Sequence, residues 1–128
     1  MKQISTDNAP AAFGPFSQAM VANGMVFTSG ALPLDPETGE RVEGGIVDQT
    51  HRTMKNLQAV VEAAGASMET IVQVMIYLTD MKDFAKMNEV YATYYKDRFP
   101  ARATVGVAAL AKGSLVEIQA IAVTHITK

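Results

Sequence analysis

Two neighbouring segments, 47-VDQTHRTMKNLQAVVEAA-64 and 71-IVQVMIYLT-79, decide the fold. In the first, small or apolar residues recur at positions 47, 50, 54, 57, 61 and 64, which are the steps of three and four residues that predict an amphipathic helix. Gly65 follows where a glycine often ends a helix. In the second, apolar residues at 72, 74, 76 and 78 alternate with period two and predict a strand. Its other face carries Ile71, Met75 and Tyr77, so we expect both faces of this strand to be covered.

Shorter elements precede this pair. Two strands are expected at residues 17–22 and 25–29, joined by Asn23-Gly24, because these two residues tolerate the positive φ of a tight hairpin turn. The stretch 33–45 holds two prolines, three glycines and five charged residues, which predicts an exposed loop.

Further elements follow. A second helix should begin at Asp80 or Asp83 and end at Pro100. Its apolar stripe consists of Phe84, Met87, Tyr91 and Tyr94. Two last strands are expected at 101–110 and 115–126, with residues 112–114 between them. This connection permits a hairpin, but a central strand could also lie between the two.

The order of these elements predicts a mixed α/β pattern: a single domain over residues 1–128, with a mixed sheet of about six strands and two helices on one face. Two helices cover only one face of such a sheet, and no second layer remains in the sequence. A homo-oligomer that packs sheet against sheet would cover the other face. Only 19% of the residues are charged, which agrees with surface hidden between copies.

Composition excludes several kinds of site. The chain has no cysteine, so disulfides, thiolate nucleophiles and sulfur metal ligands are ruled out. Two histidines, His51 and His125, cannot form a three-histidine metal site, and no metal is expected. A net charge of −2 argues against nucleic acid and anionic membranes. No apolar leader or membrane-length apolar run is visible, so a cytoplasmic location is expected.

Two charged residues stand in unusual places. Arg102 lies in a small, apolar strand, where its planar guanidinium could bind a carboxylate or form an ordinary ion pair, and Thr104 shares its face by strand parity. Glu117 interrupts the most apolar strand of the chain. A buried carboxylate needs a reason, and acid–base catalysis is one; a water-facing strand end is the alternative.

Weaker candidates lie elsewhere. Phe16 follows a tight Gly-Pro turn, and Ser29 and Gly30 end a strand where backbone N–H groups could meet a ligand. Asn88 lies beside the apolar stripe of the second helix. No phosphate-binding glycine loop and no G-x-S-x-G nucleophile motif occurs in the sequence.

Several of these stretches together resemble the RidA/YjgF family of reactive-intermediate deaminases. They are PAR at 100–102 through Val105 and Leu110, VEI at 116–118, APAA at 9–12, GPFSQ at 14–18, TSG at 28–30 and LQAVVEAAG at 57–65. The resemblance covers essentially the whole chain. It implies a chorismate-mutase-like α+β domain that forms homotrimers, with ligand sites in clefts between subunits.

The resemblance also implies an activity: hydrolysis of 2-imino acids, namely 2-iminobutanoate and 2-iminopropanoate, to 2-oxo acids and ammonia, without a cofactor. Such imines leave pyridoxal-dependent dehydratases and damage other enzymes. By the same resemblance, Arg102 would bind the substrate carboxylate and Glu117 would position the attacking water. Ser29, Gly30 and Thr104 would line the cleft, with Asn88 nearby.

This sequence departs from the family pattern at two positions. Many members carry tyrosine where this chain has Phe16, and cysteine where it has Thr104. Either change could lower activity or shift the substrate preference. One alternative is therefore a trimeric protein that binds small carboxylates such as 2-oxo acids without turnover. A ribonuclease, reported for some members, fits the acidic composition least.

Overall fold

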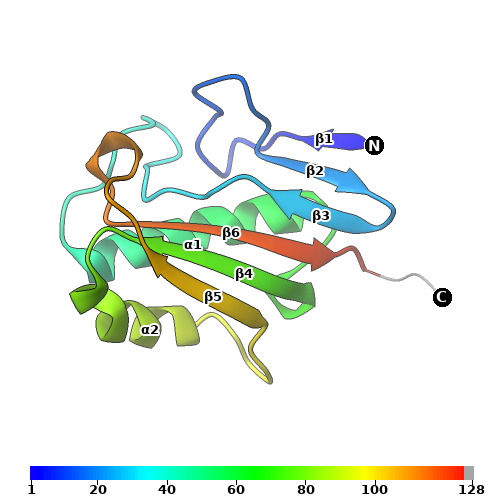
Figure 1. Cartoon of the computed structure of the whole chain (residues 1–128). Helices are drawn as coiled ribbons and strands as arrows, with labels where there is room; N and C mark the ends of the chain where they lie inside the picture. The colour runs from blue at the N-terminus through cyan, green and yellow to red at the C-terminus, as the bar shows by residue number, and fades with distance from the viewer. Residues whose placement is uncertain (126–128) are drawn as a thin grey trace.

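The computed structural model describes residues 1–125 as one six-stranded sheet with two helices against one face (Figure 1). The strands are β1 (Lys2–Ile4), β2 (Ala19–Ala22), β3 (Met25–Thr28), β4 (Ile71–Leu78), β5 (Ala101–Gly106) and β6 (Val116–Val123). The helices are α1 (Ile46–Ala63) and α2 (Phe84–Ala92), and short 3-10 turns precede β4, α2 and β6. The expected α+β class is confirmed.

The strands follow the order β1-β2-β3-β6-β4-β5 across the sheet. β4 pairs with β5 in parallel and with β6 antiparallel. Of the two arrangements that the sequence left open, the one with a central strand between the last two is therefore correct. β5 also ends at Gly106 rather than at residue 110. Residue 126, the expected end of the last strand, lies outside the described residues.

Helix α1 packs on the sheet through the expected stripe, since Thr50, Met54, Leu57 and Val61 are all fully buried. Gly65 follows with a φ of +86°, the left-handed conformation that ends a helix at little cost to glycine. The predicted apolar stripe was wrong at its first residue. Residue 47 is exposed, and the buried residue of the first turn is its neighbour, residue 46.

A bulge changes the start of β4. Val74, Ile76 and Leu78 are fully buried against the helices, as the alternation predicted. The register with β6 shifts between Ile71 and Gln73, so Ile71 is buried and residue 72 is 46% exposed. One extra residue in a strand reverses the faces on either side of it, which simple alternation does not reveal.

Of the predicted connections between elements, the hairpin turn is confirmed, whereas the loop and the end of the second helix differ from the prediction. Asn23 and Gly24 have φ values of 52° and 73°, which confirms the predicted hairpin turn. The loop 33–45 is not exposed throughout, because Leu34 is only 2% exposed and forms part of the interior. Helix α2 ends at Ala92, eight residues before Pro100, and a non-helical segment fills the difference.

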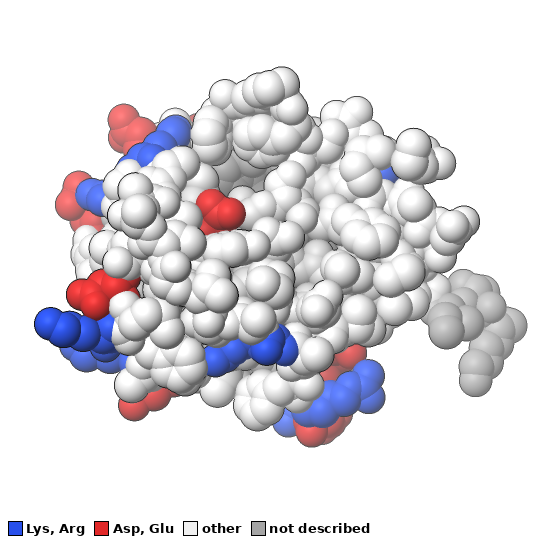
Figure 2. Space-filling view, in the orientation of Figure 1, with Lys and Arg blue, Asp and Glu red and all other residues white. Residues whose placement is uncertain are grey.

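The second face of the sheet is open. Phe27 on β3 and Val105 on β5 are 43% and 40% exposed there, although both are large and apolar. The view in Figure 2 looks onto this face, and charged side chains lie mostly around its edge rather than across it. A face with so few charges and with exposed apolar side chains is typical of a surface that another molecule covers.

Candidate functional site

Glu117 lies on the open face of β6. Its neighbours Val116 and Ile118 point into the core and are fully buried, while Glu117 is half-buried opposite Tyr77 of β4. Within residues 1–125 its carboxylate has no hydrogen-bond partner. Burial raises the pKa of the Glu117 carboxyl above its ordinary value. A carboxyl with these properties is suited to accept and release a proton.

The segment after β3 runs directly beside Glu117. Ala31 and Ile118 exchange two backbone hydrogen bonds of 2.7 and 3.0 Å, which fixes this segment against β6. The Ser29 hydroxyl donates to the carbonyl oxygen of Ser17 at 2.6 Å. Gly30 is therefore held next to the Glu117 side chain, and Ser29 precedes it in this segment.

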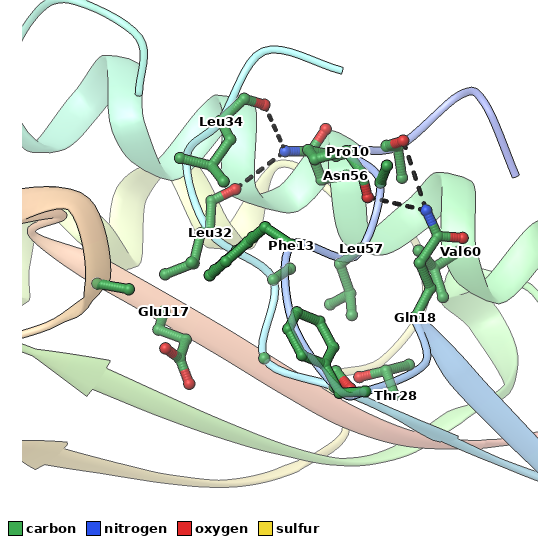
Figure 3. A pocket seen from close by; sticks show the side chains of 17 residues that line it. Pro10, Phe13, Gln18, Thr28, Leu32, Leu34, Asn56, Leu57, Val60 and Glu117 are labelled. Atoms are coloured by element: carbon green, nitrogen blue, oxygen red, sulfur yellow. Dashed lines mark hydrogen bonds between the residues drawn. The ribbon is translucent and has the colours of Figure 1, made fainter. Parts of the chain in front are cut away.

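A cavity of about 300 Å³ opens from Glu117 toward helix α1 (Figure 3). Phe16, Ser29, Gly30 and Glu117 line it, so four of the seven candidate residues meet at one cavity. Sequence reasoning missed further lining residues, namely Phe13, Asn56, Leu57 and Val60. The amide of Asn56, directly before Leu57 of the predicted apolar stripe, was the signal that could have found them.

Two amides hold the walls of this cavity. Asn56 donates hydrogen bonds of 2.9 Å to the carbonyl oxygens of both Leu32 and Leu34. On the other side, the Gln18 amide donates to the carbonyl oxygens of Thr6 and Pro10 at 3.0 and 2.9 Å. The dashed lines of Figure 3 follow the two bonds of Asn56 and the bond from Gln18 to Pro10. These bonds tie two loops to the cavity rim.

Arg102 lies on the helix-covered face, at the edge strand β5. It is level with the buried residue Val74, and its guanidinium carbon is 5.5 and 5.0 Å from the ring centres of Phe84 and Tyr91 in α2. Such stacking attracts the cation and fixes its direction. Arg102 and Asn88 both border a second hollow, between α2 and the start of β5.

Two buried polar atoms lie on this same side. The Oδ1 atom of Asn88 and the Oγ1 atom of Thr104 have no hydrogen-bond partner within the described part of the chain. An unpartnered buried polar atom costs about 1–3 kcal/mol. Together with a guanidinium that is held by aromatic rings, they leave hydrogen-bonding capacity available beside Arg102.

Within one chain, Arg102 and Glu117 do not meet. Arg102 faces the helices, as does Thr104, which is level with the buried residue Ile76. Glu117 faces the opposite side of the sheet, and β4 lies between the two strands that carry them. The candidate residues therefore form two separate groups, one around Glu117 at the cavity and one around Arg102 beside α2.

Comparison with known proteins shows to which family this chain belongs. The family model described as Endoribonuclease L-PSP matches residues 6–124. The chain belongs to this family, that of the RidA/YjgF proteins.

Individual relatives resemble the chain along nearly their whole length. The 2-iminobutanoate/2-iminopropanoate deaminase of Mus musculus is 47% identical over 95% of this chain and 90% of its own. Protein DfrA of Myxococcus xanthus is 52% identical over 96% and 95% of the two chains. Among solved structures, Escherichia coli TdcF with bound serine has a TM-score of 0.93 at 41% identity, covering 98% of this chain and 100% of that one.

Neither a membrane helix nor a metal cluster was found in the described part of the chain. None of the helices within residues 1–125 is long and apolar enough to cross a bilayer. The same residues contain no group of three or more histidine, cysteine, aspartate or glutamate side chains placed to hold a metal ion.

Proposed function

We propose that this protein hydrolyses the C=N bond of short 2-imino acids, 2-iminobutanoate and 2-iminopropanoate, to 2-oxo acids and ammonia. The observation that carries the proposal is the half-buried, unpartnered Glu117 carboxyl beside Gly30, at the mouth of a cavity. The mouse relative named for this activity, 47% identical, supports the same assignment.

The reaction needs one group that exchanges protons. Glu117 takes a proton from water as the water oxygen bonds to C2 and the π electrons of the C=N bond move to nitrogen; Glu117 then gives this proton to the nitrogen, which leaves a carbinolamine. In the second stage Glu117 takes the hydroxyl proton of the carbinolamine and passes it to the nitrogen, so that the C2–N bond breaks, ammonia leaves and the carbonyl of the 2-oxo acid forms. Arg102 binds the neighbouring carboxylate through two parallel hydrogen bonds and so holds C2 beside the water.

This mechanism requires Arg102 and Glu117 to approach one small molecule. Since they occupy opposite faces of the sheet in one chain, we place each site between two copies, with Glu117 from one and Arg102 from the other. The apolar open face supports such an assembly, which we propose to be a homotrimer located in the cytoplasm. Phe16, Ser29 and Gly30 then complete the Glu117 side, and Asn88 and Thr104 complete the Arg102 side.

A trapping assay tests this function. A threonine dehydratase releases the imine in the presence of semicarbazide, and the protein competes with the trap by hydrolysing the imine first. The expected result is a lower yield of semicarbazone with the wild-type protein and no such effect with Arg102→Ala, at an unchanged oligomeric state. An equal decrease in semicarbazone yield with both proteins would show that Arg102 is not needed for the reaction.

Binding without turnover is the second candidate, favoured by the serine bound to TdcF, a structure 41% identical to this chain. A protein of this kind would bind 2-oxobutanoate in a calorimetric titration and leave the lifetime of the imine unchanged. The deaminase would shorten that lifetime, so the two assays together separate the candidates.

A further inference from the structure

The cavity beside Glu117 is much larger than the methyl or ethyl group of the short imino acids. Its volume of about 300 Å³ equals that of roughly ten water molecules at about 30 Å³ each. Leu57 and Val60 of α1 and Leu34 of the preceding loop line it, and all three are buried.

The polar groups in its walls are already occupied. Asn56 donates to two carbonyl oxygens, and its Oδ1 atom accepts from Nε of Arg52 at 3.2 Å. Thr28 accepts a hydrogen bond from the backbone N–H of Ala120 at 2.9 Å. Among the described residues, Glu117 is the lining side chain that offers a charge without a partner. Beyond that carboxyl, the cavity therefore suits an apolar group.

We propose that this cavity receives the side chain of the imino acid, and that the protein prefers 2-imino acids with apolar side chains longer than ethyl, such as the imine of leucine. The inference rests on the proposed function, because it takes Glu117 as the group beside C2. The side chain and the carboxylate are both attached to C2, so one can enter the cavity while the other extends toward Arg102 of a second copy.

Val60 and Val61 offer a matched pair for testing this. They are adjacent, buried valines of α1, but only Val60 lines the cavity. Val60→Leu extends a side chain into the cavity, and Val60→Ala enlarges it. Val61→Ala removes the same two methyl groups from the core on the sheet side and serves as the control.

The experiment compares imines that an L-amino-acid oxidase makes from alanine, 2-aminobutanoate and leucine, with semicarbazide as the trap. Each methylene that becomes buried should raise kcat/KM about fourfold, so the wild-type protein should favour the leucine imine over the alanine imine at least tenfold. Val60→Leu should lower this ratio, while Val61→Ala should leave it unchanged. Equal kcat/KM for long and short imines, or equal changes in the ratio for Val60→Leu and Val61→Ala, would overturn the proposal.

Binding of 2-oxo acids tests the side-chain cavity independently of imine hydrolysis. Calorimetry with pyruvate, 2-oxobutanoate and 4-methyl-2-oxopentanoate needs no catalysis. If no imine is hydrolysed but affinity still rises with chain length, the proposed activity fails and the side-chain cavity stands. If imines are hydrolysed while neither affinity nor kcat/KM depends on chain length, the activity stands and the cavity proposal is overturned. Circular dichroism and gel filtration establish that each variant is folded.

Discussion

The side chain of Glu117 lies against the Cα atom of Gly30 with no room for another carbon. A Cβ atom built on Gly30 would stand 2.6 Å from Cδ and 2.8 Å from Cγ of Glu117, well inside contact distance. Gly30 does not have a positive φ, so the backbone itself would accept another residue. The requirement for glycine comes from the position of the carboxyl.

Gly30→Ala should therefore displace Glu117 while leaving the fold intact, because the end of a flexible side chain can move aside. A displacement of about 1 Å in a catalytic group lowers rate by about a hundredfold, and we expect kcat to fall by about 10–100-fold. Steady-state kinetics of imine hydrolysis measures this. Gly45→Ala is the control, since a Cβ there meets no atom within 4 Å. Equal activity of the two variants would contradict the positioning role of Gly30.

Mixing two inactive variants tests whether one site uses two copies. Arg102→Ala and Glu117→Gln should each be inactive alone, but a trimer assembled from both contains some sites with an intact arginine and an intact glutamate. Random assembly from equal amounts restores about a quarter of the sites in a cyclic trimer. Activity after co-expression or joint refolding measures this. A mixture with the double variant Arg102→Ala/Glu117→Gln should restore none, and a mixture of the single variants that stays inactive would contradict a shared site.

The pKa of Glu117 predicts how activity depends on pH. Because burial raises this pKa, the ionised form that accepts a proton is lost at a higher pH than for an ordinary glutamate, whose pKa is 4.5. The acidic limb of the kcat/KM profile should lie above that value. Gly30→Ala, which moves the carboxyl toward solvent, should shift the limb to lower pH; an unshifted limb would mean that another group titrates.

The same pKa has a consequence for stability. A carboxyl whose pKa is raised by folding binds more protons in the folded state, so stability falls as pH rises from the ordinary pKa through the raised one. Glu117→Gln should accordingly increase the thermal midpoint at neutral pH, and the gain should disappear in acid below both pKa values. Thermal unfolding at matched protein concentrations measures it. A gain of equal size at both pH values would indicate another cause.

Asn56 predicts a purely structural effect. Asn56→Ala leaves the carbonyl oxygens of Leu32 and Leu34 without their donor in a buried position, which should lower the free energy of unfolding by about 2–3 kcal/mol. Urea denaturation at fixed protein concentration measures it. The control is Gln58 of the same helix, whose hydrogen bond to Glu62 is exposed, and Gln58→Ala should change stability by less than about 0.5 kcal/mol.

Local rules predicted much of the fold because they depend on neighbours along the chain. The period of α1, the turn at Asn23 and Gly24 and the buried alternation of β4 follow from side-chain spacing and backbone φ. The bulge after Ile71 and the early end of α2 were missed, because pairing with β6 and packing of residues 93–100 decide them. Which strand pairs with β6 is likewise decided by contacts between segments that are distant in the sequence.

Four of the seven candidate residues lie together at the cavity, but the sequence did not predict how the seven are arranged. Arg102 and Glu117 stood out because charges are rare in apolar strands. Strand parity correctly put Thr104 with Arg102. Parity within one strand does not relate two different strands, so the opposite faces of Arg102 and Glu117 needed the register of both against β4. Asn56 and Val60 reach the cavity from a helix, at a distance in sequence that no motif links.

The position of β6 in the middle of the sheet has a consequence for synthesis on the ribosome. β1, β2 and β3 form one antiparallel group and β4 and β5 another, and β6 alone joins them. Among the strands within residues 1–125 it is also the last to emerge. The nascent chain therefore carries two separate sheet fragments with unpaired edges until β6 has been synthesised, and during that interval it is exposed to misassembly with other chains.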